Sequence, residues 1–465
     1  MTSKTILAGS LAAFLALISA TLCAEPVGWR TDWTGQYPEE IPPLTWSADK
    51  NVLWKVATKR WSNATVVIHE NKLFYGEEPD TLVCASKENG EELWRVSTAY
   101  GELLSNESAK AAKKQQEEMA ALKARDKEYV AEDRRLNAEV RKDPSNQELK
   151  KQLNSVRQER NQVRRKLQAL QRKPGSKLPA THNTNGYTSA TPLVDGKRVY
   201  VLYGSGVAAG YDLEGNRQWA RIVGRPKNGW GHSASPVLAD GTLIVHIAGE
   251  VYGLDPETGE TRWTTASSQF WGTPFPFAIG KRAWAVLTTG GVVIRASDGK
   301  VLAKGIGIMP WSSPVARNGV LYIADTNGAF AYRIPESDQE PVTFEKLWQV
   351  AIKRDRYYSS PIVHDGLLYN VTQRGQMTVL DITNGKIVYE HAFRLGGTFF
   401  PSITLAGAFL FVSSDTGKTV LFHPGREYRE VGMNQLDGFR SNLVFEDTRI
   451  YLRTNKYLYC LAESP

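Results

Sequence analysis

The chain has 465 residues, of which 42% are hydrophobic and 23% are charged. This balance excludes an intrinsically disordered chain and a collagen-like fibre. The formal net charge is +8, but residues 102–173 hold 19 Lys or Arg against 12 Asp or Glu, which leaves the rest of the chain almost neutral. We therefore expect any attraction to an anionic partner to be confined to that segment.

Residues 1–24 are predicted to be a signal peptide. Lys4 supplies the positive start, and the apolar run over residues 6–20 is shorter than the about 20 residues of a membrane-spanning helix. Cys23 raises the alternative of a lipoprotein anchor, but Leu22 stands before it, where lipoprotein signals usually carry a small residue. We expect cleavage after Ala24 and a periplasmic or secreted protein with no transmembrane segment and no nucleic-acid partner.

The rest of the chain carries a repeat. The clearest copies are Ser-Pro-Val-Leu at 235–238, Ser-Pro-Val-Ala at 313–316 and Ser-Pro-Ile-Val at 360–363. Each copy continues with a polar turn, an apolar strand, a second turn, another apolar run and a Gly-bearing hairpin. A four-stranded unit that recurs about every 40–45 residues is typical of a β-propeller.

Eight copies are present, and their innermost strands are predicted to begin near Val66, Pro192, Pro236, Pro274, Pro314, Pro361, Pro401 and Leu443. The eighth copy ends after its third strand. Residues 51–56 resemble the outer strands at 92–96 and 346–350, so we expect them to complete the last blade and close the ring. The outer-strand tryptophans are expected to fill the space between blades: Trp54, Trp94, Trp219, Trp263 and Trp348.

The predicted fold is therefore all-β, an eight-bladed propeller of four-stranded antiparallel blades. It occupies residues 46–101 and 176–465, and residues 25–45 form an N-terminal arm. The pattern of an aromatic residue, Ser/Thr-Pro-Val, Asp-Gly, Val-Tyr and Leu-Asp-x-x-Thr-Gly-x-x-x-Trp resembles the pyrroloquinoline-quinone (PQQ) repeat. That repeat builds the propellers of the quinoprotein dehydrogenases and of the outer-membrane β-barrel assembly lipoprotein, and the chain resembles the latter more. The resemblance implies the fold and leaves the activity open.

Residues 102–175 form an insert between the first two blades, with a helix-favouring composition that is interrupted at 143–146. We expect a helix on each side of this turn, packed as an antiparallel coiled-coil hairpin, with Ser145 and Glu148 as the capping box of the second helix. Arg160 is predicted to lie beside Tyr129, between Asp126 and Asp133.

The functional interpretation of the insert is an arm that docks onto an envelope protein or an anionic surface. The alternatives are an inert insertion or a hairpin folded down onto its own propeller. The arm residues expected to contact a partner are basic: Arg134, Arg135, Lys150, Lys151, Arg157, Arg164 and Arg165.

The positions before the repeat proline suggest a second site. They are occupied by Thr65, Thr191, Ser235, Thr273, Ser313, Ser360, Phe400 and Asn442, and aromatic residues stand just upstream. An eightfold repeat would place them around one mouth of the channel. A site for a planar or sugar-like ligand is one interpretation, and caps of the inner strands are the other. The candidate residues are Trp61, Thr191, Ser235, Trp271, Thr273, Trp311, Ser313, Tyr358 and Ser360.

Signals of catalysis are missing. The sequence has no adjacent Cys pair, no Cys-x-x-Cys-His and no His-Glu-x-x-His motif.

Cys84 and Cys460 follow the predicted signal peptide, and export would permit a disulfide between them, although two small buried residues are the simpler interpretation. We predict a monomeric, non-catalytic scaffold of the cell envelope with no cofactor. The alternative is a quinone- or sugar-dependent enzyme or sensor, with PQQ as a candidate cofactor, at the channel mouth.

Overall fold

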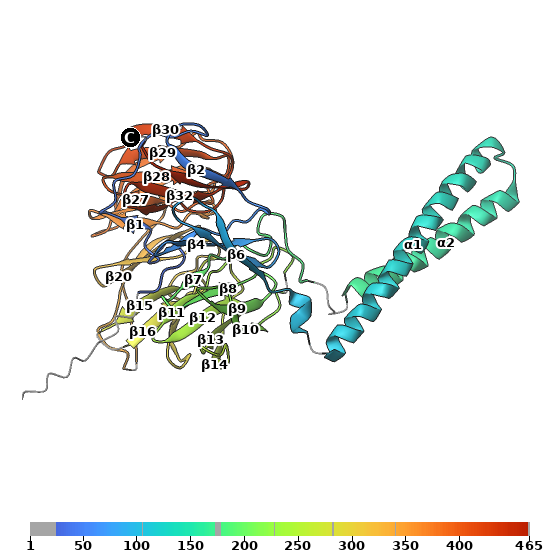
Figure 1. The fold of residues 1–465 in the computed structure, drawn as a ribbon, viewed down its shortest axis with the longest axis horizontal. Helices are drawn as coiled ribbons and strands as arrows, with labels where there is room; N and C mark the ends of the chain where they lie inside the picture. The colour runs from blue at the N-terminus through green and yellow to red at the C-terminus, as the bar shows by residue number, and fades with distance from the viewer. Residues whose placement is uncertain are drawn as a thin grey trace, which may run out of the picture.

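The computed structural model describes residues 25–104, 106–172, 178–226, 228–280, 283–339 and 341–463. The predicted signal peptide, with Cys23, lies outside them. Eight four-stranded antiparallel sheets stand around one axis, and a helical hairpin extends from one face of the ring (Figure 1). The eight-bladed propeller predicted from the repeat is thereby confirmed.

The first four blades follow one another in chain order from the axis outwards. They consist of β3 (Val67–His69), β4 (Lys72–Glu77), β5 (Thr81–Ser86) and β6 (Glu92–Ser97); β7 (Leu193–Val194), β8 (Arg198–Leu202), β9 (Val207–Asp212) and β10 (Arg217–Ile222); β11 (Val237–Ala239), β12 (Thr242–Ile247), β13 (Glu250–Leu254) and β14 (Thr261–Ala266); and β15 (Phe275–Ile279), β16 (Ala283–Leu287), β17 (Val292–Arg295) and β18 (Val301–Lys304).

The last four blades complete the ring. They consist of β19 (Val315–Arg317), β20 (Val320–Asp325), β21 (Gly328–Arg333) and β22 (Glu345–Val350); β23 (Ile362–His364), β24 (Leu367–Val371), β25 (Gln376–Asp381) and β26 (Ile387–Ala392); β27 (Thr404–Ala406), β28 (Phe409–Ser413), β29 (Lys418–His423) and β30 (Arg429–Gln435); and β31 (Val444–Glu446), β32 (Arg449–Arg453), β33 (Tyr457–Leu461) and β2 (Val52–Ala57).

The ring is closed by the strand that the sequence predicts. β2 pairs antiparallel with β33, with Lys55 opposite Tyr459 and Val56 opposite Leu458. The outer strand of the last blade thus comes from the N-terminal part of the chain. This pairing leaves no unpaired edge between the two ends of the repeat array.

The N-terminal arm lies inside the ring, a position that the sequence does not predict. Val27 forms an antiparallel bridge with Val194 of β7, and β1 (Gln36–Tyr37) pairs parallel with β27. Between them, Trp33 packs against the cores of the second to fifth blades. Because β7 and β27 are both innermost strands, the arm occupies the central channel and fills it with its own side chains.

Arg30 fixes the middle of this arm. Its side chain is fully buried and donates hydrogen bonds to the carbonyl oxygens of Pro361 (3.0 Å) and Ile403 (2.9 Å), which precede the inner strands of two neighbouring blades. Burial lowers the pKa of the guanidinium to about 10. Arg30 has a φ of 54°, in the left-handed region that non-glycine residues rarely adopt, so these contacts hold the backbone in an unfavourable conformation.

Outer-strand tryptophans join the blades, as predicted. The indole N–H of Trp94 donates to the carbonyl oxygen of Leu213 at 3.1 Å, and its ring covers Gly215, where an added Cβ would lie 2.8 Å from the indole. Gly215 also has a φ of 89°, so the hairpin needs glycine for its turn and for this close approach. The same contact recurs between other tryptophans and hairpin glycines: Trp54 with Gly90, Trp219 with Gly259, Trp263 with Gly299, and Trp348 with Gly385.

The insert is an antiparallel helical hairpin of α1 (Asn106–Lys142) and α2 (Gln147–Arg172) that stands away from the ring (Figure 1). The alternative of a hairpin folded onto the propeller is therefore wrong. The seam is narrow and apolar at the buried side chains of Met119, Leu136, Leu153, Val163 and Leu170. At 1.5 Å per residue, α2 is about 39 Å long.

Two details of the hairpin differ from the prediction. Asn146 caps α2, because its Oδ1 accepts the backbone N–H of Leu149 at 3.1 Å, whereas the hydroxyl of Ser145 donates to Asp143. Asn and Ser are equally good caps, and the helix begins one residue later than expected. Arg160 does pair with Asp126 (3.2 Å).

The second aspartate of the seam has another partner. Asp133 pairs with Arg157 at 2.6 Å, one helical turn before Arg160. Tyr129, expected beside Arg160, donates its hydroxyl to Glu159 at 2.5 Å. The antiparallel register of the two helices is therefore as predicted, but the two aspartates pair with different arginines, Asp126 with Arg160 and Asp133 with Arg157.

The foot of the hairpin is anchored on the second blade. Tyr100, in the 3-10 helix η1 (Tyr100–Leu103), is buried, and its hydroxyl accepts a hydrogen bond from Arg225 at 3.0 Å. Glu102 forms an ion pair with Arg217. Leu104 and Leu178, on the two sides of the hairpin, pack against the same core.

Cys84 and Cys460 are both buried free thiols. Burial raises the pKa of the Cys84 thiol to about 12 and that of Cys460 to about 11. Both thiols stay protonated at neutral pH, which makes them poor nucleophiles. They therefore contribute to the core as small apolar side chains.

Candidate functional site

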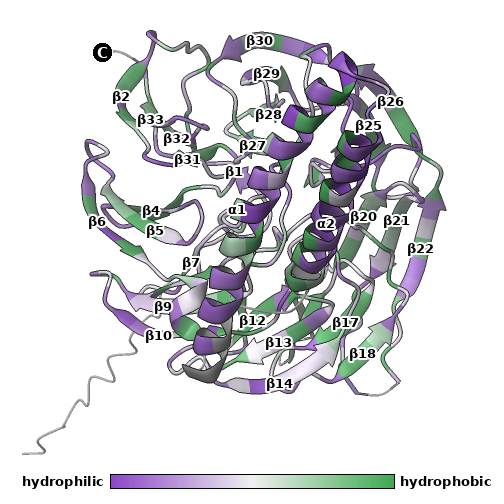
Figure 2. Ribbon diagram, turned by 90° about the vertical axis from the view of Figure 1, so that its right-hand side faces the viewer, coloured by the Kyte–Doolittle hydropathy of each residue, from purple (hydrophilic) through white to green (hydrophobic). Residues whose placement is uncertain are grey.

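A cavity of about 580 Å³ opens at one mouth of the channel, where the inner strands begin. Each inner strand runs away from this face and each outer strand returns to it, so the hairpin that follows β6 leaves from the same face as the cavity. Figure 2 looks onto this face with the hairpin in front. Residues directly after the hairpin line the cavity, among them His182, Asn185 and Ser189.

The hydroxyl and amide side chains at the starts of the inner strands form a ring of hydrogen bonds below the cavity. Seven of the eight accept the backbone N–H of the equivalent residue in the preceding blade. The bonds run from Thr65 to Thr191 (3.3 Å), Thr191 to Ser235 (3.0 Å), Ser235 to Thr273 (3.0 Å), Ser313 to Ser360 (2.9 Å), Ser360 to Ser402 (3.1 Å), Ser402 to Asn442 (2.8 Å) and Asn442 to Thr65 (3.0 Å).

The ring is interrupted between the fourth and fifth blades. The hydroxyl of Ser313 is buried and has no hydrogen-bond partner among the described residues. At this junction the backbone N–H of Trp271 bonds instead to the carbonyl oxygen of Pro310 at 2.8 Å. Gly272 permits the close approach, because a Cβ there would lie 2.1 Å from the carbonyl oxygen of Ser312. One hydroxyl of the ring, at a residue that lines the cavity, is thus left without a partner among the described residues.

The seventh blade corrects the alignment of the repeat. Its ring position is Ser402 and not Phe400, because β27 begins at Thr404, two residues after Ser402. Pro401 was taken for the proline of the repeat, but in this blade Ile403 stands at the position that proline holds in other blades. Phe400 instead stacks on Tyr358, with ring centroids 4.7 Å apart and planes at 15°.

Aromatic rings form the wall of the cavity around this polar ring. Tyr358 also contacts Trp311 edge-on at 6.0 Å, and the indole of Trp271 is fixed by a 3.1 Å hydrogen bond from Nε1 to the carbonyl oxygen of Gly231. Trp230 is 55% exposed at the rim, beside the ring of His182. The N-terminal arm contributes Trp29.

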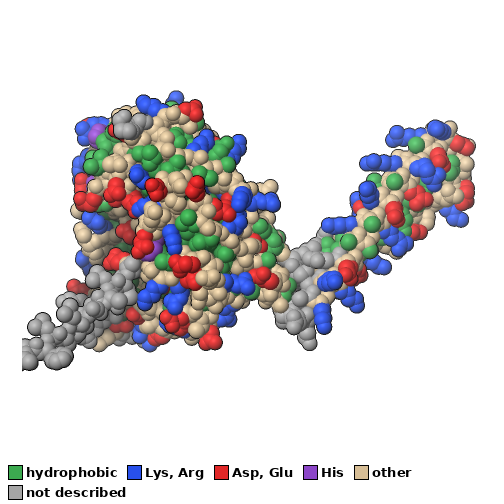
Figure 3. All heavy atoms as spheres, in the orientation of Figure 1, with side chains coloured by type: hydrophobic (Ala, Val, Ile, Leu, Met, Phe, Trp, Pro, Cys, Tyr) green, Lys and Arg blue, Asp and Glu red, His purple; other side chains and the backbone are tan. Residues whose placement is uncertain are grey.

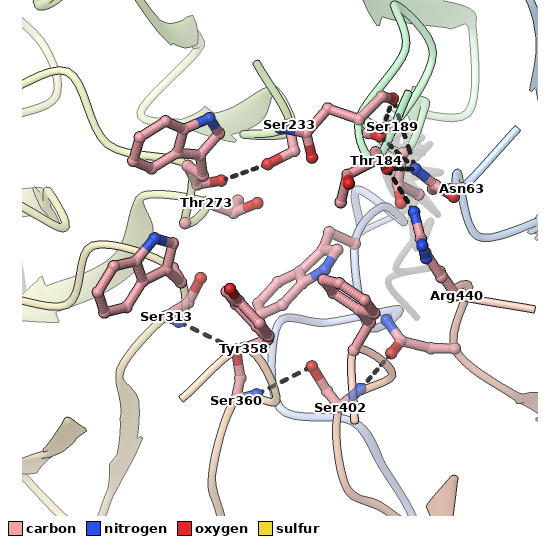
Figure 4. Close-up of a pocket in the computed structure, with 18 of the residues that line it drawn as sticks. Asn63, Thr184, Ser189, Ser233, Thr273, Ser313, Tyr358, Ser360, Ser402 and Arg440 are labelled. Carbon is pink, nitrogen blue, oxygen red and sulfur yellow. Dashed lines mark hydrogen bonds between the residues drawn. The ribbon is translucent and has the colours of Figure 1, made fainter. Parts of the chain in front are cut away.

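Two arginines provide the charge of the cavity. The guanidinium of Arg356 lies 5.4 Å from the ring centroid of Trp311 and donates to the hydroxyl of Tyr358 at 3.3 Å. Arg440 lies over Phe400 at 4.5 Å and donates to the carbonyl oxygen of Thr184 at 2.7 Å (Figure 4). None of the described residues that line the cavity is Asp or Glu, so the site favours anions over cations.

Of the nine residues proposed for the channel mouth, seven line the cavity: Thr191, Trp271, Thr273, Trp311, Ser313, Tyr358 and Ser360. The other two are not among the lining residues. Trp61 lies over Gly186, and the Ser235 hydroxyl is part of the hydrogen-bonded ring. Four further lining residues were not among those predicted: Trp29, Asn63, Arg356 and Arg440. Asn63 and Arg440 stand two residues before the ring positions Thr65 and Asn442, as Trp271 does before Thr273, so the repeat offset could have marked them.

The seven basic residues proposed for the arm lie on the hairpin but divide into two groups. Arg157 and Arg164 pair with aspartates of α1, and Arg135 pairs with Glu132 and Glu139. Among the described residues, no ion pair occupies the remaining four: Arg134, Lys150, Lys151 and Arg165. These four side chains are the ones free to contact an acidic partner.

Two buried histidines lie in the third blade. The Nε2 atom of His246 lies 2.8 Å from the carbonyl oxygen of Ser268, so this nitrogen carries the proton and donates a hydrogen bond to the carbonyl. Burial lowers its pKa to about 4. Burial, together with the neighbouring His246, lowers the pKa of His232 to about 3. Both rings are neutral in the folded protein at neutral pH.

Over the described part of the chain, no cluster of three or more His, Cys, Asp or Glu side chains could hold a metal ion. Within the same residues, no helix is long and apolar enough to cross a bilayer. The residues that line the cavity offer stacking surfaces, hydrogen-bonding groups and positive charge.

A sequence model of the family described as "Outer membrane protein assembly factor BamB" matches residues 46–135 and 161–303, half of the chain. The outer membrane protein assembly factor BamB of Yersinia pestis is 22% identical over 238 residues, which is 44% of this chain. The match spans 56% of that relative's length.

Solved structures of similar fold include BamB from Moraxella catarrhalis and the quinohemoprotein alcohol dehydrogenase of Comamonas testosteroni. The former has a TM-score of 0.46 and 15% identity, and covers 57% of this chain and 82% of its own. The latter has a TM-score of 0.52 and 10% identity, and covers 90% of this chain and 79% of its own. At that identity the dehydrogenase supports the propeller fold alone.

Proposed function

Because the chain belongs to the family of the outer membrane protein assembly factor BamB, we propose that it is a non-catalytic scaffold of the cell envelope. The hairpin and the cavity face of the propeller together form its docking surface for another envelope protein. The residues of the cavity support binding, because they combine rings, hydroxyls and guanidinium groups, and no Asp or Glu that could act as a base is among the described lining residues.

The observation that carries this proposal is the hairpin, which stands off the cavity face and brings its basic side chains with it (Figure 3). The hairpin adds little to the stability of the propeller, because its apolar side chains are buried between its own two helices. It holds unpaired cations of both helices well away from the ring. An acidic surface on the partner is the complement.

A deletion tests the proposal. Residues 106–172 are replaced by a short Gly/Ser linker, while Glu102, Leu104 and Leu178 remain to keep the foot of the hairpin packed. The propeller melt should stay nearly unchanged, because loop length alone costs little free energy. Affinity purification from the periplasm should lose the partner proteins that the full chain captures.

Charge variants separate the arm surface from the arm as a spacer. Replacing the four unpaired cations with Gln (Arg134, Lys150, Lys151 and Arg165) should weaken capture of the same partners, and higher salt should weaken it further. The matched control replaces four exposed cations of the propeller: Lys197, Arg317, Lys346 and Lys386. Equal capture by the hairpin-deleted and full proteins would contradict the proposal and move the docking surface to the propeller alone.

A further inference from the structure

The cavity at the channel mouth is large enough for a small molecule, and the docking function proposed above makes no use of its interior. Its volume of about 580 Å³ falls within the range of roughly 300–1,000 Å³ typical of small-molecule sites. We infer that the cavity binds an acidic saccharide, with one or two sugar rings that carry a carboxylate. The inference concerns the cavity alone and stands independently of the hairpin.

The aromatic wall fits the faces of sugar rings. Trp271 and Trp311 come from neighbouring blades, each just before an inner strand, and Trp29 enters from the N-terminal arm. Aromatic side chains offer a rigid apolar face beside polar edges, which matches a pyranose with its C–H groups on the faces and its hydroxyls around the rim. Trp271 is held in place by its hydrogen bond to Gly231, so part of this surface is formed before a ligand arrives.

The polar groups of the cavity fit the hydroxyl rim of a sugar. The hydroxyl of Ser313 is 1% exposed, lies where the hydrogen-bonded ring is interrupted, and has no partner among the described residues. A buried hydroxyl without a partner is costly, and a ligand hydroxyl would remove that cost. The amides of Asn185 and Gln373 add side chains that can both donate and accept (Figure 4 shows the polar residues around the cavity).

The positive charge of the cavity favours a saccharide that carries a carboxylate. Arg356 and Arg440 lie at its edge, and no Asp or Glu is among the described residues that line it. Within 4 Å of the guanidinium of Arg356 no carboxylate is found among the described residues, whereas Arg440 pairs with Asp415 at 3.5 Å. Arg356 is therefore the group assigned to the ligand carboxylate, which a guanidinium binds with a charge-assisted hydrogen bond.

The test uses the full chain and two acidic probes with uncharged counterparts. The probes are digalacturonate and N-acetylmuramic acid, and the counterparts are methyl-esterified digalacturonate and N-acetylglucosamine. Binding is followed by tryptophan fluorescence and by titration calorimetry. At least one acidic probe should bind saturably, about tenfold more tightly than its counterpart, as expected for one charge-assisted hydrogen bond; which probe binds distinguishes a uronic acid from a muramic acid source.

Three variants assign the contacts. Arg356→Gln should remove the preference for the acid, Ser313→Ala should weaken both acid and counterpart, and Trp311→Ala should weaken binding and reduce the fluorescence response. Trp284→Ala, at a 45% exposed tryptophan of β16 outside the cavity, is the matched control. The melt of each variant checks that it folds, and the hairpin-deleted protein should bind as the full chain does.

The inference is overturned if neither acidic probe binds up to millimolar concentration, or if the uncharged counterparts bind as tightly. It is also overturned if folded Trp311→Ala and Trp284→Ala respond alike. Loss of partner capture without loss of saccharide binding would leave this inference intact, and the reverse result would leave the docking function intact.

Discussion

Replacement of Ser360 with alanine removes one link from the hydrogen-bonded ring that joins the inner strands. The hydroxyl of Ser360 accepts the backbone N–H of Ser313 at 2.9 Å, and both residues are 1% exposed. Water has little access to the N–H that loses its acceptor. A buried donor left without a partner costs about 1–3 kcal/mol, so we expect the free energy of unfolding to fall by about 2 kcal/mol.

The matched control is Ser313→Ala. It changes the same residue type at the same position of the neighbouring blade, with the same burial, but the hydroxyl that it removes has no partner among the described residues. Because a buried hydroxyl without a partner is itself costly, the free energy of unfolding should stay constant or rise. Any difference between the two variants therefore reports the hydrogen bond and not the loss of a buried oxygen.

Urea titrations followed by tryptophan fluorescence measure both variants against the unaltered protein. The transition midpoint should fall for Ser360→Ala and stay constant or rise for Ser313→Ala, with equal slopes. Hydrogen exchange at the Ser313 amide should also become faster in Ser360→Ala. Equal losses in the two variants, or none in Ser360→Ala, would refute the argument that the ring stabilises the fold.

Three further predictions follow from other parts of the structure. Deletion of residues 25–57 removes Arg30 and the closing strand β2, so the cooperative melt of the whole propeller should be lost or strongly lowered; an unchanged melt would contradict ring closure by β2. Because the sequence has no adjacent Cys pair and the cavity no carboxylate among its described residues, PQQ with Ca²⁺ should produce no dye-linked oxidation of alcohols or aldehydes. His232 and His246 are neutral in the fold, with pKa values of about 3 and about 4, but protonate near 6.5 when the chain is unfolded. The free energy of unfolding should therefore fall as the pH drops through about 6.5 towards 4, by up to about 1.4 kcal/mol per pH unit for each ring. His246→Gln should flatten this slope in urea titrations.

Much of the fold could be predicted because its determinants are local. The Ser/Thr-Pro dipeptides, the hairpin glycines and the outer-strand tryptophans recur at a fixed period, and residues 51–56 carry the missing outer-strand pattern. The position of the arm could not be predicted in this way. Arg30 and Trp33 act through contacts with inner strands distant in sequence, at left-handed φ angles for which neither residue has a local preference.

The same distinction applies to the cavity. The repeat predicted Thr191, Trp271 and Ser313 because each stands at a repeated position. Trp29 reaches the cavity from the N-terminal arm, which occurs once, so no periodic signal could mark it. Arg440 stands at the same repeat offset as Trp271, two residues before its ring position, but a charged residue there does not match the aromatic pattern. Ser402 was missed for a different reason, because Pro401, directly before it, imitated the repeat proline.

Ring closure also sets the order in which the protein can be completed. β33 ends at Leu461 and pairs with a strand that begins at Val52, and Arg30 bonds to carbonyl groups of Pro361 and Ile403. β2 and Arg30 thus find these partners only after the last blades have been synthesised. Contacts of such sequence separation slow folding, so β2 must stay unpaired while the rest of the chain is made, and a chaperone that shields this short strand would act on the step that closes the ring.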